Sequence, residues 1–147
     1  MTTAQNKKLV EKYFDACSRG DSWVISDMYA PEGVHIVLGH TLLSTTYTKK
    51  QMFEVSGQVM NYFPEGLKYT VDNMIAENDT VVAEVHCDGK HVSGVYYHNE
   101  YAFIMKFRDG ELLESKEYFD TEAATEVLCG GNRPPRGTAR QAPDILE

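Results

Sequence analysis

Through the first 63 residues, apolar positions recur at the three- and four-residue spacing of an amphipathic helix. Residues 3–19 carry one such face, and Gly20 follows as a stop signal, so the sequence predicts a helix over this range. Asp21 can cap a short second helix, which Pro31 and the residues after it would end. The first part of the chain is therefore expected to be helical.

The middle segment combines a short strand with a third helix. Residues 34–38 form a brief apolar run that predicts a strand, and residues 39–47 are typical of a loop. Thr48 can then cap a helix over residues 49–63, whose apolar residues share one face.

From residue 67 onward the pattern changes to alternation of apolar and polar residues, which is typical of strands. The predicted strands are residues 68–77, 80–87, 92–107 and 111–119. Turn residues at Asn78-Asp79, Asp88-Gly89 and Asp109-Gly110 would join them as hairpins. Helices followed by an antiparallel sheet predict an α+β fold in which the helices cover one face of the sheet.

Length and composition indicate a single globular domain. The chain has 147 residues, of which 42% are hydrophobic and 24% charged, and no apolar run reaches the length of a membrane span. We expect one domain over residues 1–128, including a short helix at 122–128, and a tail over 129–147 that is a lid, an arm on a neighbouring subunit or a disordered segment. The polar N-terminus lacks a secretory pattern, so a cytoplasmic protein is expected.

The net charge, the cysteines and the histidines argue against several kinds of partner and ligand. The net charge is -8 and the basic residues are scattered, which argues against nucleic acid. Three widely spaced cysteines indicate reduced thiols rather than disulfides or zinc ligands. The five histidines form no pair with helical metal-ligand spacing, so no metal is expected, although ligands from distant segments stay open. Phosphate-loop and flavin motifs are missing, so no cofactor is expected.

One carboxylate in the last predicted strand attracts attention. Because strand side chains alternate, Glu117 shares a face with Leu113, Ser115 and Phe119. Apolar neighbours disfavour the charged form of a carboxylate and suit it to proton transfer. A charged residue near a strand end can also be solvated or salt-bridged.

Two segments resemble a known superfamily. They are KYFDACSRGDSWVISDMYAPEGV in the helical half and FRDGELLESKEYFDT in the closing hairpin. Together with the order of elements, they resemble the SnoaL-like branch of the nuclear transport factor 2-like superfamily over about residues 9–121. The resemblance implies a cystatin-like α+β barrel, in which a cone-shaped, curved mixed sheet wraps around three N-terminal helices and a blind apolar pocket. It also implies a homodimer through the outer face of the sheet.

The resemblance to two enzyme groups of this superfamily is incomplete. Tyr13 stands where ketosteroid isomerases have their oxyanion-hole tyrosine, but Val37 fills the position of their general-base aspartate. Glu117 matches one catalytic aspartate of limonene epoxide hydrolases, because EYFD stands where they have DYFD. The valine and cysteine at positions 85 and 87 replace their arginine and second aspartate, and His35 replaces their water-binding tyrosine. The sequence therefore lacks part of the catalytic residues of both enzyme groups.

The same register sorts side chains into an inner and an outer face of the sheet. The inner sets are apolar except for a few polar residues, which form the candidate site. Catalytic roles are predicted for Glu117 and His35 as an acid/base couple. Substrate contacts are predicted for Tyr13, Asn99, Tyr101, Ser115, Trp23, Met28, Phe103 and Phe119.

Three functions are compatible with this site. The leading hypothesis is a cofactor-free isomerase, cyclase or dehydratase that acts on a hydrophobic small molecule, such as a polyketide, terpenoid or steroid-like intermediate of secondary metabolism. The second is a non-catalytic binding or dimerisation module. The third is a hydrolase in which Glu117 activates water.

Overall fold

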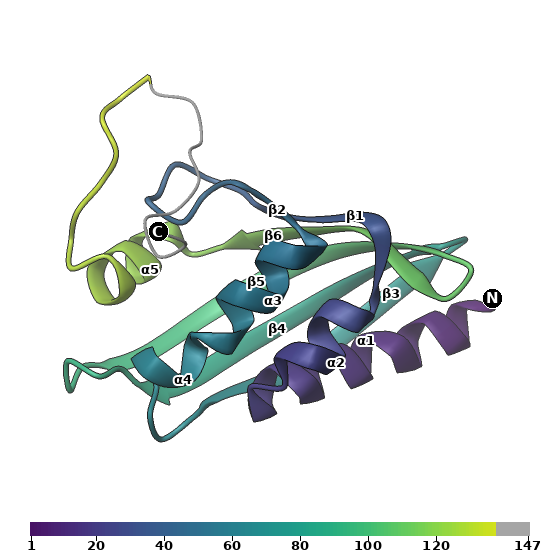
Figure 1. Ribbon diagram of the computed structural model, residues 1–147, viewed down its shortest axis with the longest axis horizontal. Helices are drawn as coiled ribbons and strands as arrows, with labels where there is room; N and C mark the ends of the chain where they lie inside the picture. Colours follow the sequence, from purple (N-terminus) through teal and green to yellow (C-terminus); the bar gives the residue numbers. More distant parts are fainter. Residues whose placement is uncertain (138–147) are drawn as a thin grey trace.

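Six strands form one mixed sheet, and four helices lie across one of its faces (Figure 1). The computed structural model describes residues 1–137. Its elements are α1 (Thr3–Arg19), α2 (Ser22–Asp27), β1 (Tyr29–Val37), β2 (Thr46–Thr48), α3 (Lys49–Gly57), α4 (Val59–Tyr62), β3 (Leu67–Glu77), β4 (Thr80–Lys90), β5 (Tyr96–Arg108), β6 (Glu111–Phe119) and α5 (Thr121–Leu128). The strand order is β2-β1-β6-β5-β4-β3, with β1 and β6 parallel and the other pairs antiparallel. The α+β prediction is confirmed.

The first helix has the predicted bounds because both of its ends carry local signals. Thr2 and Gln5 form a capping box that satisfies free backbone N–H groups at the start of α1. Gly20 adopts φ +66° and ends the helix, donating its N–H to carbonyls of the last turn. One face of α1 then packs on the sheet, where the Phe14 ring contacts Phe103 edge-on at 4.8 Å.

The prediction of a second helix up to Pro31 was too long, and the strand after it was predicted too short. The helix α2 ends at Asp27, and β1 already begins at Tyr29. The Pro31 segment lies in an irregularity of the β1–β6 pairing rather than at a helix end. A Cβ on Gly33 would lie 2.5 Å from the carbonyl oxygen of Leu112, so only glycine allows this close approach of the two strands.

Two of the three predicted turns are confirmed. Asn78 and Asp109 have positive φ values of 53° and 50°, as tight hairpin turns require. The turn at Asp88-Gly89 was wrong, because β4 continues through it to Lys90 and the chain reverses over residues 91–95. Gly89 is instead a point of close contact, since a Cβ there would lie 2.8 Å from the Gly66 carbonyl oxygen.

The third predicted helix is divided in two. The helix α3 ends at Gly57, and α4 begins at Val59 after Gln58. The short helix predicted over 122–128 is present as α5, at one end of the sheet (Figure 1). Residues 138–147 of the predicted tail lie outside the described residues. No helix within residues 1–137 is long and apolar enough to cross a membrane.

Candidate active site

A cavity of about 250 Å³ lies between the inner face of the sheet and the helices. Helices α1, α3 and α4 line one side of it, and residues of α5 lie at one end. Most of the wall is aromatic or aliphatic, with six tyrosines, one histidine and one glutamate. Such a wall is typical of sites for hydrophobic small molecules, although the volume is somewhat below the usual range of about 300–1,000 Å³.

The histidine and the glutamate of this wall contact each other. His35 lies on β1 and Glu117 on the parallel strand β6, where Glu117 pairs with Val37 two residues from His35. The Nε2 atom of His35 lies 3.2 Å from Oε1 of Glu117. The His35 side chain is 6% exposed and that of Glu117 20%, so the pair is largely shielded from solvent. The sequence pattern placed both residues on the inner face, and the structure brings them together.

Two tyrosines continue this contact behind the histidine. The Tyr29 hydroxyl lies 3.2 Å from Nδ1 of His35 and 2.8 Å from the Tyr13 hydroxyl. When Glu117 is ionised, it accepts the Nε2 hydrogen of a neutral His35, so Nδ1 accepts from Tyr29 and Tyr29 accepts from Tyr13. Both ring nitrogens of His35 and both tyrosine hydroxyls of this Tyr13–Tyr29–His35–Glu117 chain then have a partner. The chain fixes the tautomer of His35 and the position of the carboxylate.

Burial keeps the tyrosines protonated. It raises the pKa of both Tyr13 and Tyr29, and their closeness to each other and to Glu117 adds to the effect on Tyr13. Among the described residues, no lysine or arginine lines the cavity. Glu117 is the only carboxylate among the described residues that line the cavity, and it has no lysine or arginine beside it in the lining.

The predicted site residues fall into three groups. Six of the ten line the cavity, namely Tyr13, His35, Tyr101, Phe103, Glu117 and Phe119. Asn99 and Ser115 are buried on the inner strands but lie behind the wall. Met28 is a core residue outside the lining, and Trp23 is 74% exposed, with its ring against Phe53 at 4.6 Å. These last two therefore do not form part of the cavity wall.

Sequence reasoning did not include Tyr29 or Tyr97 in the site. Tyr29 had been assigned to a helix, and the irregularity before Val34 breaks the strand alternation that would have linked it to His35. Tyr97 is buried and lines the cavity, although it was not among the predicted substrate contacts. Its even spacing from Tyr101 and Phe103 was the available signal.

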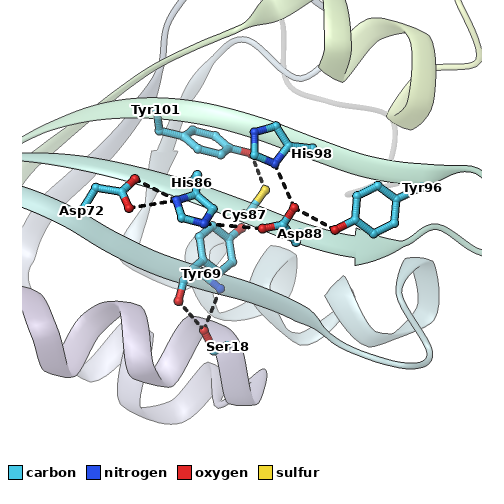
Figure 2. Close-up of polar contacts among 9 residues, drawn as sticks. All are labelled: Ser18, Tyr69, Asp72, His86, Cys87, Asp88, Tyr96, His98 and Tyr101. Carbon is cyan, nitrogen blue, oxygen red and sulfur yellow. Dashed lines mark hydrogen bonds and ion pairs between the residues drawn. The ribbon is translucent and has the colours of Figure 1, made fainter.

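A second group of histidines and carboxylates lies on the outer face of the sheet (Figure 2). His86 contacts Asp72 at 2.7 Å and Asp88 at 3.5 Å, and Asp88 also accepts from His98 and from the Tyr96 hydroxyl, both at 2.8 Å. The hydrogen bond to Asp72 raises the pKa of His86, and the one from His98 lowers that of Asp88. Within residues 1–137 no group of three or more potential ligands is arranged to hold a metal ion.

Comparison with known families assigns the fold. The sequence model of the SnoaL-like domain matches residues 10–115, which is most of the chain. The chain belongs to the SnoaL-like domain family. Comparison with curated protein sequences finds no match.

Solved structures share the fold of this SnoaL-like protein at low sequence identity. AclR of Streptomyces galilaeus, a proposed hydroxylase, is 19% identical with a TM-score of 0.73 over 92% of this chain and 91% of AclR. PrhC of Penicillium brasilianum is 14% identical with a TM-score of 0.79 over 88% and 89% of the two chains. A proposed SnoaL-like polyketide cyclase of Jannaschia sp. CCS1 is 20% identical with a TM-score of 0.72 over 90% and 95%. At this identity they establish the fold but not the reaction.

Proposed function

We propose that this SnoaL-like protein is a cofactor-free acid/base enzyme, of the isomerase, cyclase or dehydratase kind, that acts on a hydrophobic small molecule. One observation carries the proposal: the only carboxylate among the described residues lining an apolar cavity is held by a buried histidine, which is itself held by Tyr29. A carboxylate that served only the fold would not need a cavity in front of it and a relay of hydrogen bonds behind it.

Glu117 is the group that moves the proton. Its carboxylate removes a hydrogen from a carbon next to a carbonyl, so that a C–H bond breaks, an O–H bond forms on Glu117, and the electron pair moves to the carbonyl oxygen. In an isomerisation the proton returns from Glu117 to another carbon of the same molecule, so that its bond to Glu117 breaks and a new C–H bond forms. In a dehydration the proton goes to a hydroxyl on the adjacent carbon, the C–O bond breaks as the enolate electron pair returns to form a C=C bond, and water leaves. His35 holds Oε1 by its Nε2 hydrogen and stabilises the ionised form before the transfer.

The substrate class follows from the wall of the cavity. The rings of Phe103 and Phe119 stack against that of Tyr101, with centroids 5.4 and 6.0 Å from it, and form an aromatic surface of the cavity. Such a surface suits a planar polyketide, terpenoid or steroid-like molecule of secondary metabolism. The fold shared with a proposed polyketide cyclase supports this choice. A homodimer through the outer face of the sheet completes the proposal, and light scattering of the purified protein measures it.

A non-catalytic binding module is the second candidate. The observation that favours it is the volume of about 250 Å³, which is small for an enzyme that must hold and release a hydrophobic substrate. A binding module would hold the same ligands without moving a proton.

Hydrogen exchange at a model ketone separates the two candidates. With 2-tetralone in D₂O, mass spectrometry measures deuterium incorporation at the carbons next to the carbonyl. We expect the wild type to accelerate exchange over buffer, and Glu117→Gln to lose at least about 100-fold of this acceleration, the usual contribution of a general base. Glu114→Gln, on the other face of β6, is the matched control and should keep the wild-type rate. Saturating binding of 2-tetralone without accelerated exchange would support the binding module instead.

A further inference from the structure

At the end of the cavity away from Glu117, two tyrosine hydroxyls form a second polar group. The Tyr97 and Tyr101 hydroxyls lie 3.1 Å apart, and both rings line the cavity. Asn99, on the same strand, donates from Nδ2 to the Tyr97 hydroxyl at 2.7 Å. The Cys87 thiol contacts the Tyr101 hydroxyl at 3.5 Å (Figure 2). No residue of the Tyr13–Tyr29–His35–Glu117 chain has a hydrogen bond with this group.

The orientation of Asn99 is fixed by the backbone. Its Oδ1 accepts the N–H groups of Glu100 at 2.7 Å and Asp120 at 3.1 Å, and its Nδ2 also donates to the Asp120 carbonyl at 2.9 Å. An acceptor atom must therefore stand at Oδ1, and Nδ2 must face Tyr97. Asn99 can donate to the tyrosine pair but cannot accept from it.

This arrangement leaves one hydroxyl hydrogen over. Tyr97 and Tyr101 carry two hydroxyl hydrogens, and only one of them lies between the two oxygens. Either tyrosine can donate in this contact, because the Tyr97 oxygen can accept from both Asn99 and Tyr101. In the order Asn99 to Tyr97 to Tyr101, which we adopt, the spare hydrogen is that of Tyr101. Among residues 1–137 the other hydrogen-bond partner of the Tyr101 hydroxyl is the Cys87 thiol, which donates to the Tyr101 oxygen at 3.5 Å and so does not use this hydrogen. A donor without an oxygen partner thus faces the cavity.

The distance from Glu117 separates this donor from the proposed chemistry. Phe103 is the Cα partner of Glu117, and Asn99 is the partner of Cys87. The Tyr101 hydroxyl contacts Cys87 and Tyr97, so it leans away from Phe103 toward the level of Asn99. Between the Cα positions of Phe103 and Asn99, four residues of strand span about 13 Å. The oxygen that accepts from Tyr101 is therefore not the carbonyl next to the reacting carbon.

The charges around the cavity define the kind of acceptor. No lysine or arginine among the described residues lines it, and Glu117 contributes a negative charge. Burial raises the pKa of Tyr97 and of Tyr101, so both remain neutral donors. A carboxylate or phosphate would lose its water here without gaining a cation. A neutral carbonyl oxygen gains a hydrogen bond at a smaller desolvation cost.

We propose that Tyr101, oriented through Tyr97 by Asn99, forms a second subsite that binds an uncharged carbonyl oxygen at the far end of an elongated, planar ligand. The inference rests on the proposed function in that it names the substrate class of the same cavity. The substrate would then carry two oxygens, one at the carbon that Glu117 deprotonates and one at the remote end. Tyr101 is the binding residue, and Asn99 is a positioning residue.

A pair of matched probes tests this subsite by binding rather than turnover. The ketone 2-acetylnaphthalene and the hydrocarbon 2-isopropenylnaphthalene have nearly the same shape, but only the ketone has an acceptor oxygen. We expect Tyr101→Phe to weaken binding of the ketone by about threefold to tenfold, the value of one hydrogen bond, and to change hydrocarbon binding by less than about twofold. Calorimetric titration measures both. The infrared C=O stretch of the bound ketone should lie lower in the wild type than in Tyr101→Phe.

Further variants separate this subsite from general packing and from catalysis. Asn99→Asp turns the donor toward Tyr97 into an acceptor, so it should remove the spare hydrogen and reduce the preference for the ketone as Tyr101→Phe does. If Asn99→Asp does not fold, Tyr101→Phe still gives the decisive comparison. Tyr118→Phe, a half-exposed tyrosine of β6, should change neither affinity.

Two results would overturn the subsite. One is an equal loss of ketone and hydrocarbon binding in Tyr101→Phe, and the other is an unchanged C=O stretch. Glu117→Gln should keep the preference for the ketone, because the carboxylate is remote. If Glu117→Gln loses exchange activity but keeps the preference for the ketone over the hydrocarbon, the subsite is supported independently of the catalytic role of Glu117. If Glu117→Gln keeps its exchange activity, the proposed function fails but the subsite does not.

Discussion

The sheet carries a histidine–carboxylate contact on each of its faces, and only one of them faces a cavity. On the inner face, His35 and Glu117 lie 3.2 Å apart, with 6% and 20% of their side chains exposed. On the outer face, His86 and Asp72 lie closer, at 2.7 Å, but are 29% and 49% exposed. Water and salt weaken the outer contact, whereas the inner one acts in a medium of lower dielectric. A short contact therefore does not by itself indicate a site.

The second ring nitrogen of each histidine also has a different partner on the two faces. In His35 it contacts the buried Tyr29 hydroxyl, which has no charge and in turn contacts Tyr13. In His86 it faces another carboxylate, Asp88, so two negative groups surround the ring. The outer arrangement favours a protonated imidazole, whereas the inner one places an uncharged hydroxyl behind the ring that orients Glu117. The same residue types thus serve surface electrostatics in one place and proton transfer in the other.

The largest expected contrast is in activity. His35→Gln removes the imidazole that holds Glu117, so we expect exchange of 2-tetralone to fall about 100-fold. His86→Gln changes the same residue type on the outer face and should leave the rate within about twofold. Exchange rates of both variants, with circular dichroism to verify folding, provide the test. Equal losses in the two variants would mean that the inner contact has no special role.

The next contrast is in the free energy of unfolding. It compares Tyr29, which contacts His35 on the inner face, with Tyr96, which contacts Asp88 on the outer face. Tyr29→Phe deletes a buried hydroxyl between Tyr13 and His35, and the unpaired partners should lower the free energy of unfolding by about 1–3 kcal/mol. Tyr96→Phe deletes the exposed hydroxyl that donates to Asp88 and should stay within about 0.5 kcal/mol of the wild type. Urea denaturation measures both. A larger loss for Tyr96→Phe would contradict the contrast between the faces.

Sequence patterns captured the elements that have strong local signals. The bounds of α1 follow from its capping box and Gly20, and the hairpins at Asn78 and Asp109 follow from turn residues. The prediction of a turn at Gly89 was wrong because a glycine can also mark close contact between backbones, as Gly33 does. That distinction depends on strands distant in the sequence. The sequence alone does not contain it.

The candidate site shows the same limit. Strand alternation placed His35, Glu117 and Tyr101 on the inner face, and all three line the cavity. The couple of His35 and Glu117 was predicted from their shared face, but their direct contact depends on the parallel register between β1 and β6, which the sequence pattern does not give. The apolar surroundings of Trp23 along the chain suggested a wall residue, but α2 turns its ring to the surface. Periodicity gives a residue's face, whereas tertiary packing decides what that face meets.

The smallest contrast is a dependence of stability on pH that belongs to the outer face. Folding raises the pKa of His86, chiefly through Asp72, so its contribution is fully present below the usual value of 6.5 and is lost as pH rises through the raised value. Folding lowers the pKa of Asp88, chiefly through His98, so its contribution is lost as pH falls below the usual 3.8 through the lowered value. Both contributions are present together between these two usual values.

Comparison of the wild type with His86→Gln isolates the histidine. The wild type should be slightly more stable at pH 5.5, and the difference should shrink toward zero by pH 9 as His86 loses its proton. Urea midpoints at several pH values measure it. Because His86 is close to solvent, added salt should reduce the difference at pH 5.5 as well. A difference that stays constant with pH would show that His86 acts through packing and not through its charge, and would remove the electrostatic basis of the contrast between the two faces.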